Sequence, residues 1–179
     1  TQTIGATLGE SAVKAGVEAA VVGFLLIALF LILWYRLPGL IAVIALSFYT
    51  AVLLAIFKTL PVTLTSAGIG GFIISLGMAV DANILIFARL KEELRKGKSV
   101  SDAQKDGFAR AWPSIRDSNT SSIITAGILY YFAATPVVRG FALVFGLGVI
   151  ISMFTAISAS RMFLYALAVR SSSVGARFL

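Results

Sequence analysis

Long apolar runs, interrupted by short charged segments, dominate the sequence. The gaps between charged residues leave five apolar windows, the third interrupted only by Asp81, and they cover residues 19–35, 37–57, 59–88, 118–138 and 140–160. Because roughly 20 mostly apolar residues cross the hydrocarbon core of a bilayer, each window predicts a transmembrane helix. We treat residues 1–179 as a single transmembrane domain with spans at about 12–36, 37–57, 62–90, 115–135 and 137–168.

Proline and glycine residues mark the connections between the windows. The tripeptide Leu37-Pro38-Gly39 separates the first window from the second, Pro61 follows the second, and Pro136 separates the fourth from the fifth. Proline tends to end a helix because it lacks a backbone N–H donor and restricts the residue before it. With such short connections, neighbouring spans are expected to run antiparallel. The predicted fold class is therefore an all-α membrane protein, a bundle of five transmembrane helices.

The overall composition agrees with this class and narrows the possible chemistry. Of the 179 residues, 59% are hydrophobic and 13% are charged, which leaves too little polar surface for a soluble domain. The sequence contains no cysteine and no histidine. Disulfides, thiolate metal sites and acid–base chemistry by histidine are therefore excluded. We expect no metal, no cofactor and no enzymatic activity.

The lysines and arginines predict how the bundle is oriented. Eight of the 15 lie between the third and fourth spans, and with four others they place twelve on one side, against Lys14, Lys58 and Arg139 on the other. Cytoplasmic loops carry such an excess of positive charge. The loop and the C-terminus are therefore predicted to be cytoplasmic, and the N-terminus to lie outside the cytoplasm. Because no signal peptide is visible, we expect an earlier span and an exported domain that this chain lacks.

The loop between the third and fourth spans predicts two helical pieces. Residues 89–97 continue the third helix, and an amphipathic helix is expected over about 99–112, where Ser101 opens a capping-box pattern. Phe108 and Trp112 would lie on the bilayer surface. The positive charge either anchors the topology in the lipid bilayer or forms a docking surface for a cytoplasmic partner. No nucleic-acid partner is expected, because interleaved aromatic residues and a groove-shaped basic cluster are absent.

Small residues recur at every fourth position on three of the predicted spans. These stripes consist of Ala12, Gly16 and Ala20, of Ala67, Gly71, Ser75 and Ala79, and of Gly148, Ser152, Ala156 and Ser160. Small residues let helix backbones approach closely in lipid, where no hydrophobic effect drives helices together. The stripes predict a compact bundle, and they are also compatible with helices that slide past one another.

One acidic residue, Asp81, lies deep inside a predicted span. The sequence around it, GMAVDANILIF at 77–87, is apolar apart from Asn83, and the next charged residue is Arg89. A charge at this depth costs at least about 2.5–3.5 kcal/mol, so such residues normally face the bundle interior or a wet cavity. This cost indicates that Asp81 has a structural or functional role that offsets it.

The start of the fourth span offers a polar face that could meet Asp81. This face consists of Ser118, Asn119, Ser122 and Thr125, at helical spacing. Asp81 lies eight residues, roughly 12 Å, inside Arg89. The same count inward from Asp117 reaches Thr125, so we expect the hydroxyl-lined face to extend to the level of Asp81.

Three interpretations of Asp81 are open at this point. It could be a protonated or hydrogen-bonded residue that holds helices together, or it could bind a cation with Asn83, which makes a thin ligand set. It could also couple proton movement to helix movement, because desolvation raises the pKa of a carboxyl group and lets it exchange a proton near neutral pH. We favour proton coupling, with Asp81, Asn83, Asn119, Ser122 and Thr125 as the candidate site.

The motif around Asp81 resembles a known family. Residues 77–94, GMAVDANILIFARLKEEL, are similar to the fourth-transmembrane-helix signature of SecD, a subunit of the Sec protein-export machinery. DSNTSS at 117–122 is similar to the D-x-N-x-T-T motif that opens the fifth helix of that family. The resemblance extends to the segments at 3–16, 35–46 and 136–161. It places the chain near the SecD family of the resistance-nodulation-division (RND) superfamily.

The resemblance implies an RND-type half that lacks its first helix and its large exported domain. It implies a subunit in a bacterial cytoplasmic (inner) membrane that works with a SecF-like subunit and the Sec translocon channel. That subunit would use the proton-motive force to assist translocation of a preprotein substrate. By the motif match, Asp81 is the intramembrane carboxylate, and Asp117, Asn119, Ser121 and Ser122 belong to the fifth-helix motif.

Two other functions are compatible with the sequence. One is another RND-type proton-driven exporter half, which would be favoured by a second acidic residue beside Asp81. The sequence has none there, and Ala88 stands where the SecD family usually has glutamate. The other is a scaffold subunit of the translocon that does not couple to protons, in which Asp81 only makes an internal hydrogen bond.

Overall fold

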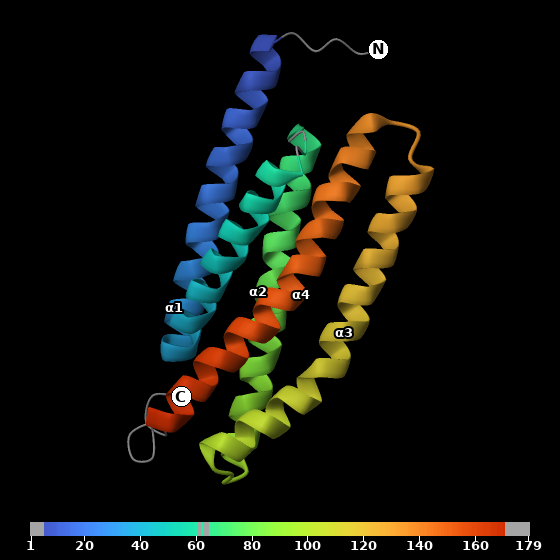
Figure 1. Cartoon of the computed structure of the whole chain (residues 1–179). Helices are drawn as coiled ribbons and strands as arrows, with labels where there is room; N and C mark the ends of the chain where they lie inside the picture. The colour runs from blue at the N-terminus through green and yellow to red at the C-terminus, as the bar shows by residue number, and fades with distance from the viewer. Residues whose placement is uncertain (1–5, 61, 63–64, 171–179) are drawn as a thin grey trace.

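The structure, a computed structural model, describes the backbone of residues 6–60, 62 and 65–170 and is helical almost throughout. Its four continuous helices are α1 (Ala6–Thr59), α2 (Ser66–Arg95), α3 (Val100–Phe132) and α4 (Pro136–Arg170). Helices α2 and α4 lie between α1 on one side and α3 on the other (Figure 1). Pro61 and Arg177, which contributed to the predicted connections and topology, lie outside the described residues, as do the side chains of residues 156–170.

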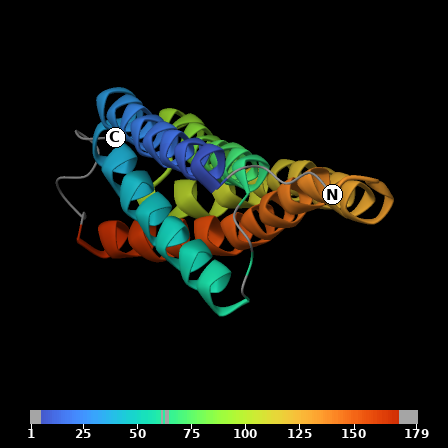
Figure 2. The same cartoon turned by 90° about the horizontal axis from the view of Figure 1, so that it is seen from above.

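Helix α1 consists of two helices joined by a sharp kink at Arg36. This residue has φ 51° and ψ −118°, a combination that is uncommon for a residue other than glycine. The chain reverses direction at this point (Figure 1), and the two halves of α1 diverge from their shared end (Figure 2). Pro38 and Gly39, which follow the kink, are buried at the corner. The connection predicted from the Leu-Pro-Gly sequence is confirmed.

Four helical segments among the described residues are long and apolar enough to cross a membrane. They are Ser11–Arg36, Pro38–Thr59, Ser66–Arg95 and Pro136–Thr155. The fourth expected span, at about 115–135, is the second half of α3, whose polar start lowers its hydropathy. It lies beside α4 as a member of the same bundle (Figure 1). The predicted all-α bundle of five helices is confirmed, with the two halves of α1 counted separately.

Helix α3 joins two elements that were predicted as separate. It runs from Val100 through Pro113 to Phe132 without a break, so the expected amphipathic helix and the expected fourth span are one helix. The expectation that Ser101 opens this helix is wrong. Ser99 is the N-cap, and its hydroxyl oxygen accepts a hydrogen bond from the backbone N–H of Asp102 at 3.2 Å.

The predicted stripes of small residues let α2 and α4 approach closely. A Cβ atom added at Gly71 would lie only 2.8 Å from the backbone oxygen of Phe141 on α4. Two further stripe residues, Ser75 on α2 and Gly148 on α4, meet one turn farther along. The structure thus confirms that the middle of these stripes serves close packing of helix backbones.

Three helices meet where Ser75 and Gly148 pack together. The hydroxyl of Ser75 donates a hydrogen bond to the backbone oxygen of Phe72 at 2.7 Å and lies 2.8 Å from the hydroxyl of Tyr49 on α1. Because a serine hydroxyl carries one proton, Tyr49 must be the donor in this second bond. Both hydroxyls are buried and have hydrogen-bond partners. The junction therefore ties α1, α2 and α4 together without an unpaired polar group.

The junction predicts a strong effect of a small change at Gly148. A Cβ atom there would lie 2.4 Å from the hydroxyl oxygen of Ser75. We expect Gly148→Ala to destabilise the protein by about 1–3 kcal/mol through overpacking, measured by thermal unfolding in detergent. Gly77→Ala on α2 is the matched control, because nothing lies within 4 Å of its added Cβ. Equal effects of the two variants would contradict the close packing described at Gly148.

Candidate functional site

Asp81 on α2 lines a small recess between α2 and α3. The recess has a volume of about 80 Å³, enough for water molecules where polar partners are present. Its polar lining consists of Asp81, Ser114, Ser118 and Asn119. Its apolar lining consists of Met78, Ala82, Leu85 and Ile115. We refer to this space as the Asp81 recess.

The Asp81 carboxylate has no hydrogen-bond or ion-pair partner among the described residues, and Asp81 is exposed on the surface of the chain. The nearby cation Arg116 is paired instead with Asp117, with 2.9 Å between the Arg116 Nε and a carboxylate oxygen. Within the described part of the chain, no group of three or more potential metal-ligating residues occurs that could hold a metal ion. The recess therefore presents a carboxylate without a charged or hydrogen-bonding partner in the described part of the chain.

The two candidate asparagines take different positions. Asn119 lines the Asp81 recess, and its side-chain amide donates a hydrogen bond to the backbone oxygen of Ile115 at 2.8 Å. Asn83 does not line the recess, because residues two apart on a helix point to nearly opposite faces. It is 2% exposed, and its amide donates to the backbone oxygen of Ala79 at 3.1 Å. Asn119 therefore shares the recess with Asp81, whereas Asn83 belongs to the interior packing of α2.

The remaining candidates on α3 do not line the Asp81 recess; they are Asp117, Ser121, Ser122 and Thr125. The hydroxyls of Ser122 and Thr125 donate to backbone oxygens one turn earlier in the same helix, at 3.2 and 2.9 Å. Asp117 is exposed and ion-paired with Arg116. A part for Ser122 and Thr125 in coupling stays a prediction, and Asp117 and Ser121 stay residues matched to the family motif only.

The level of Asp81 relative to α3 is set by a backbone contact near the α2–α3 turn. A Cβ atom added at Gly107 would lie 2.9 Å from the backbone nitrogen of Leu90. Counting nine residues back from Leu90 reaches Asp81, and counting nine forward from Gly107 reaches Arg116, within the stretch that lines the recess. The contact between Gly107 and Leu90 therefore explains which part of α3 meets Asp81.

This register differs from the expected one, which placed Thr125 level with Asp81. That expectation rests on a count of residues inward from Arg89 and Asp117, which assumes that both lie at the same depth in the membrane. In the structure, α2 and α3 already pack against each other close to the turn that joins them, at Leu90 and Gly107, so Arg89 and Asp117 do not lie at the same level. Ser118 and Asn119, rather than Thr125, therefore lie beside Asp81.

A fourth stripe of small residues, absent from the expectations above, lies at the start of α3. Ala103, Gly107 and Ala111 are all buried, and the contact of Gly107 with Leu90 shows that this stripe packs on α2. The expectation that this segment lies on the bilayer surface is therefore wrong in part. The rings of Phe108 and Trp112 stack on one another at 6.2 Å, and Phe108 packs against the core. The four-residue spacing could have revealed this face.

A second missed feature is an ion-pair cluster around Glu93, next to the α2–α3 turn. The Glu93 side chain is only 2% exposed and contacts three cations, Lys96 and Lys98 at 2.6 Å each, and Arg110 on α3. Lys98 also pairs with Asp106. Hydrogen bonds to Asp106 and then to Glu93 raise the pKa of Lys98 above its ordinary value, so it stays charged at neutral pH. We call these five residues the Glu93 cluster.

The fold and the recess together define a class of protein. It is a polytopic helical membrane protein that keeps an unpaired carboxylate deep inside one of its spans. Residues of this kind are uncommon in membrane proteins, and they mark ion, proton or substrate pathways.

Comparisons with known proteins identify the family. The family model described as protein export membrane protein SecD/SecF, C-terminal, matches residues 1–170. The chain is 56% identical over 162 residues to protein translocase subunit SecD of Thermobaculum terrenum, covering 89% of this chain and 32% of that protein. It is also 56% identical over 164 residues to SecD of Dehalococcoides mccartyi, covering 89% of this chain and 36% of that protein. The chain belongs to the SecD/SecF family.

A solved structure agrees with this assignment. A crystal structure of SecDF in a super-membrane-facing form matches with a TM-score of 0.85 and 40% identity, covering 92% of this chain and 22% of that one. The chain spans about a third of the length of the curated relatives described above. The likeness therefore concerns the membrane region of these proteins.

The Glu93 cluster predicts that one neutralising substitution loosens the α2–α3 turn. Glu93→Gln would leave Lys96, Lys98 and Arg110 close together without their shared acid. We expect the thermal midpoint in detergent to fall by roughly 5 °C, with faster trypsin cleavage near Lys98. Glu92→Gln is the control, since Glu92 is 41% exposed and exposed pairs contribute little. If Glu92→Gln lowers the thermal midpoint as much as Glu93→Gln does, the burial of Glu93 adds nothing to the stability of the turn.

Proposed function

We propose that this chain is the membrane part of a SecD-type subunit of a bacterial protein translocase, which assists the movement of preproteins across the membrane. The family match over residues 1–170 and the identity to SecD proteins support this proposal. On this proposal the subunit acts in transport and performs no covalent chemistry. It lies in the cytoplasmic membrane, with the α2–α3 turn and the C-terminus in the cytoplasm, as the distribution of lysine and arginine favours.

The proposed energy source is the proton-motive force, acting through Asp81. The observation that carries this part is the unpartnered carboxylate in a recess that can hold water. A carboxyl group with access to water can bind a proton and release it again, and its charge decides whether the surrounding helix face is stable in lipid. Protonation would let α2 and α3 change their relative position, and deprotonation would reverse the change. Asn119 and Ser118 would contact the carboxylate and its water during this cycle.

The exposure of Asp81 supports a partner in the membrane. A carboxylate inside a bilayer faces protein or a wet cavity, because exposure to lipid is costly. In the isolated chain Asp81 is exposed, which supports a second helix bundle beside it that completes its surroundings. A SecF-like subunit is the proposed partner, with the translocon channel beyond it. A preprotein would contact parts of the full-length protein that this chain does not include.

Two alternatives explain fewer observations. A scaffold subunit would hold Asp81 in an internal hydrogen bond, but its carboxylate has none within the described part of the chain. An exporter half of another RND type would favour a second acidic residue beside Asp81. Ala82, Ser118 and Asn119 occupy the neighbouring positions instead. Proton coupling in a translocase subunit therefore remains the function that fits the recess best.

Substitution of Asp81 tests the proposed coupling. In the full-length protein assembled with its partners, we expect Asp81→Asn to remove the gradient-dependent part of preprotein translocation in membrane vesicles, while translocation driven by ATP alone continues. Asparagine keeps the size and the hydrogen bonding but cannot ionise. Asp81→Glu should restore part of the gradient dependence, and Asp102→Asn, exposed near the α2–α3 turn, should have no effect. Full gradient dependence in a correctly assembled Asp81→Asn complex would rule out coupling through this residue.

Filling the Asp81 recess tests the role of its water separately. Ser118→Val adds apolar volume to the recess and removes a hydroxyl from its lining. We expect this variant to shift the pH dependence of gradient-driven translocation and to lower its rate, because proton exchange with Asp81 becomes slower. Thr120→Val is the control, since Thr120 is exposed and does not line the recess. The same pH profile in both variants would show that water in the recess plays no part.

A further inference from the structure

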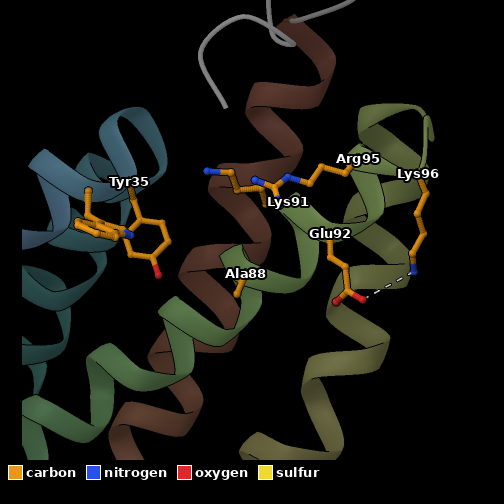
Figure 3. Close-up of a pocket in the computed structure, with 7 residues that line it drawn as sticks. Tyr35, Ala88, Lys91, Glu92, Arg95 and Lys96 are labelled. Carbon is orange, nitrogen blue, oxygen red and sulfur yellow. Dashed lines mark ion pairs between the residues drawn. The ribbon is translucent and has the colours of Figure 1, made fainter.

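A second and larger hollow lies between the kink of α1 and the end of α2. Its volume is about 470 Å³, and it is remote from Asp81, which lines the other recess. The residues that line it are Trp34, Tyr35, Ala88, Lys91, Glu92, Arg95 and Lys96. Ala88 lies between the cationic and aromatic groups and leaves the space open (Figure 3). We call this hollow the Lys91–Arg95 pocket.

The charged side chains that line this pocket point in two different directions. Glu92 and Lys96 point toward one another on the side of α3, and their charged atoms lie 3.9 Å apart (Figure 3). Lys91 and Arg95, four residues apart on one face of α2, extend toward Tyr35 on α1 (Figure 3). Neither has an ion-pair partner among the described residues. Two positive charges therefore face the open part of the pocket.

These two cations stand apart from the Glu93 cluster. Glu93 engages Lys96, Lys98 and Arg110, so the neighbouring acid does not neutralise Lys91 or Arg95. Glu92 is likewise occupied by Arg89 at 2.9 Å and by Arg110 at 3.3 Å. The acids near the pocket are thus already paired, and the pocket keeps a net positive charge that suits an anion.

The opposite wall of the pocket is aromatic and continuous with an apolar surface. Trp34 is 72% exposed, and Leu33 and Phe30 beside it on α1 are 71% and 50% exposed. Only 6% of the apolar part of this first span is buried within the described chain. Tryptophan and tyrosine are enriched where a helix meets the headgroup region of a membrane. An anion in the pocket could therefore continue into an apolar chain that lies along α1.

We propose that the Lys91–Arg95 pocket binds the headgroup of an anionic phospholipid, with the phosphate between Lys91 and Arg95 and the acyl chains along the exposed face of α1. Arginine and lysine are the side chains that bind phosphate oxygens. The tyrosine hydroxyl of Tyr35 has no hydrogen-bond partner among the described residues and faces the same space. Its O–H can donate to a phosphate or glycerol oxygen.

The lipid, rather than a soluble phosphate or an acidic peptide, is favoured by the apolar wall. A soluble anion would gain nothing from the exposed surface around Trp34. An extended acidic peptide would need polar partners for its backbone, whereas the described wall of α1 at this point is aromatic and aliphatic. A phospholipid matches both the cationic side and the apolar side with one molecule.

Quenching of Trp34 fluorescence by brominated lipids tests this proposal in the full-length protein. The chain has two tryptophans, so Trp112→Phe leaves Trp34 as the reporter from this region. Brominated phosphatidylglycerol and brominated phosphatidylcholine are titrated separately into nanodiscs, once with the subunit alone and once with its assembled partners. Tryptophans elsewhere in the full-length protein are subtracted with a Trp34→Phe variant.

We expect phosphatidylglycerol to quench Trp34 at lower mole fractions than phosphatidylcholine. Arg95→Gln should reduce this preference about fivefold, as loss of one cation near a lipid phosphate predicts, and Arg95→Lys should keep most of it. Lys105→Gln is the matched control, because Lys105 is exposed on α3 and outside the pocket. An equal loss in Lys105→Gln would indicate general surface charge and overturn the site.

Two further arms decide between occupants. Inorganic phosphate at constant ionic strength should leave the preference unchanged; if it removes the preference, the site takes a soluble anion and the lipid proposal is wrong. If no brominated lipid quenches Trp34 fluorescence in the assembled complex, a protein surface covers the pocket, and this result also overturns the proposal. Failure of the lipid test would leave the Asp81→Asn translocation test unaffected, because the two sites share no lining residue.

Discussion

The close approach of backbones along α2 is the constraint on which the rest of the structure depends. Gly71 and Ser75 bring α4 against one face of α2, and Gly107 brings α3 against Leu90 on another. In lipid these contacts cannot rely on the hydrophobic effect, so the fit of small residues decides which helices touch and at what register. The register of α3 then determines that Ser118 and Asn119 meet Asp81. The surroundings of the candidate site in the middle of the bundle are thus set by a glycine near its end.

The two ends of α2 are held by different physical means. Near Tyr49, buried hydroxyls and close packing join three helices, and every hydroxyl there has a partner. Near the α2–α3 turn, beyond the apolar windows, ion pairs of the Glu93 cluster hold the two helices together. Between these two regions Asp81 has no ion-pair or hydrogen-bond partner among the described residues, whereas its neighbours Val80, Ala82 and Asn83 are buried. A change in its charge would therefore act on one exposed face of α2, whose opposite face is packed in the core.

The features that the sequence predicted well follow from local chemistry. The apolar windows, the breaks at Leu37-Pro38-Gly39 and Pro136, and the small-residue stripes each depend on residues close together in the chain. What could not be predicted is how far one helix is displaced along another. A count inward from Arg89 and Asp117 assumes that these two residues lie at the same depth, but helices that pair beyond the apolar windows have no reason to align their first charges. The burial of Glu93 could not be predicted either, because its three cations come from the α2–α3 turn (Lys96 and Lys98) and from α3 (Arg110).

The kink at Arg36 divides α1 into a first half that is little buried in the described chain and a second half that packs closely on the bundle. The second half of α1 contributes most of the α1 residues in the core, such as Leu46, Tyr49 and Leu53, and the first half contributes Leu31. Within the described chain, 6% of the apolar window of the first half is buried. A segment with so few buried contacts can tilt at a small cost in free energy. The first half of α1 is therefore the part of the hairpin with the fewest buried contacts in the described chain, and a change in bilayer thickness would alter its tilt more readily than that of the second half.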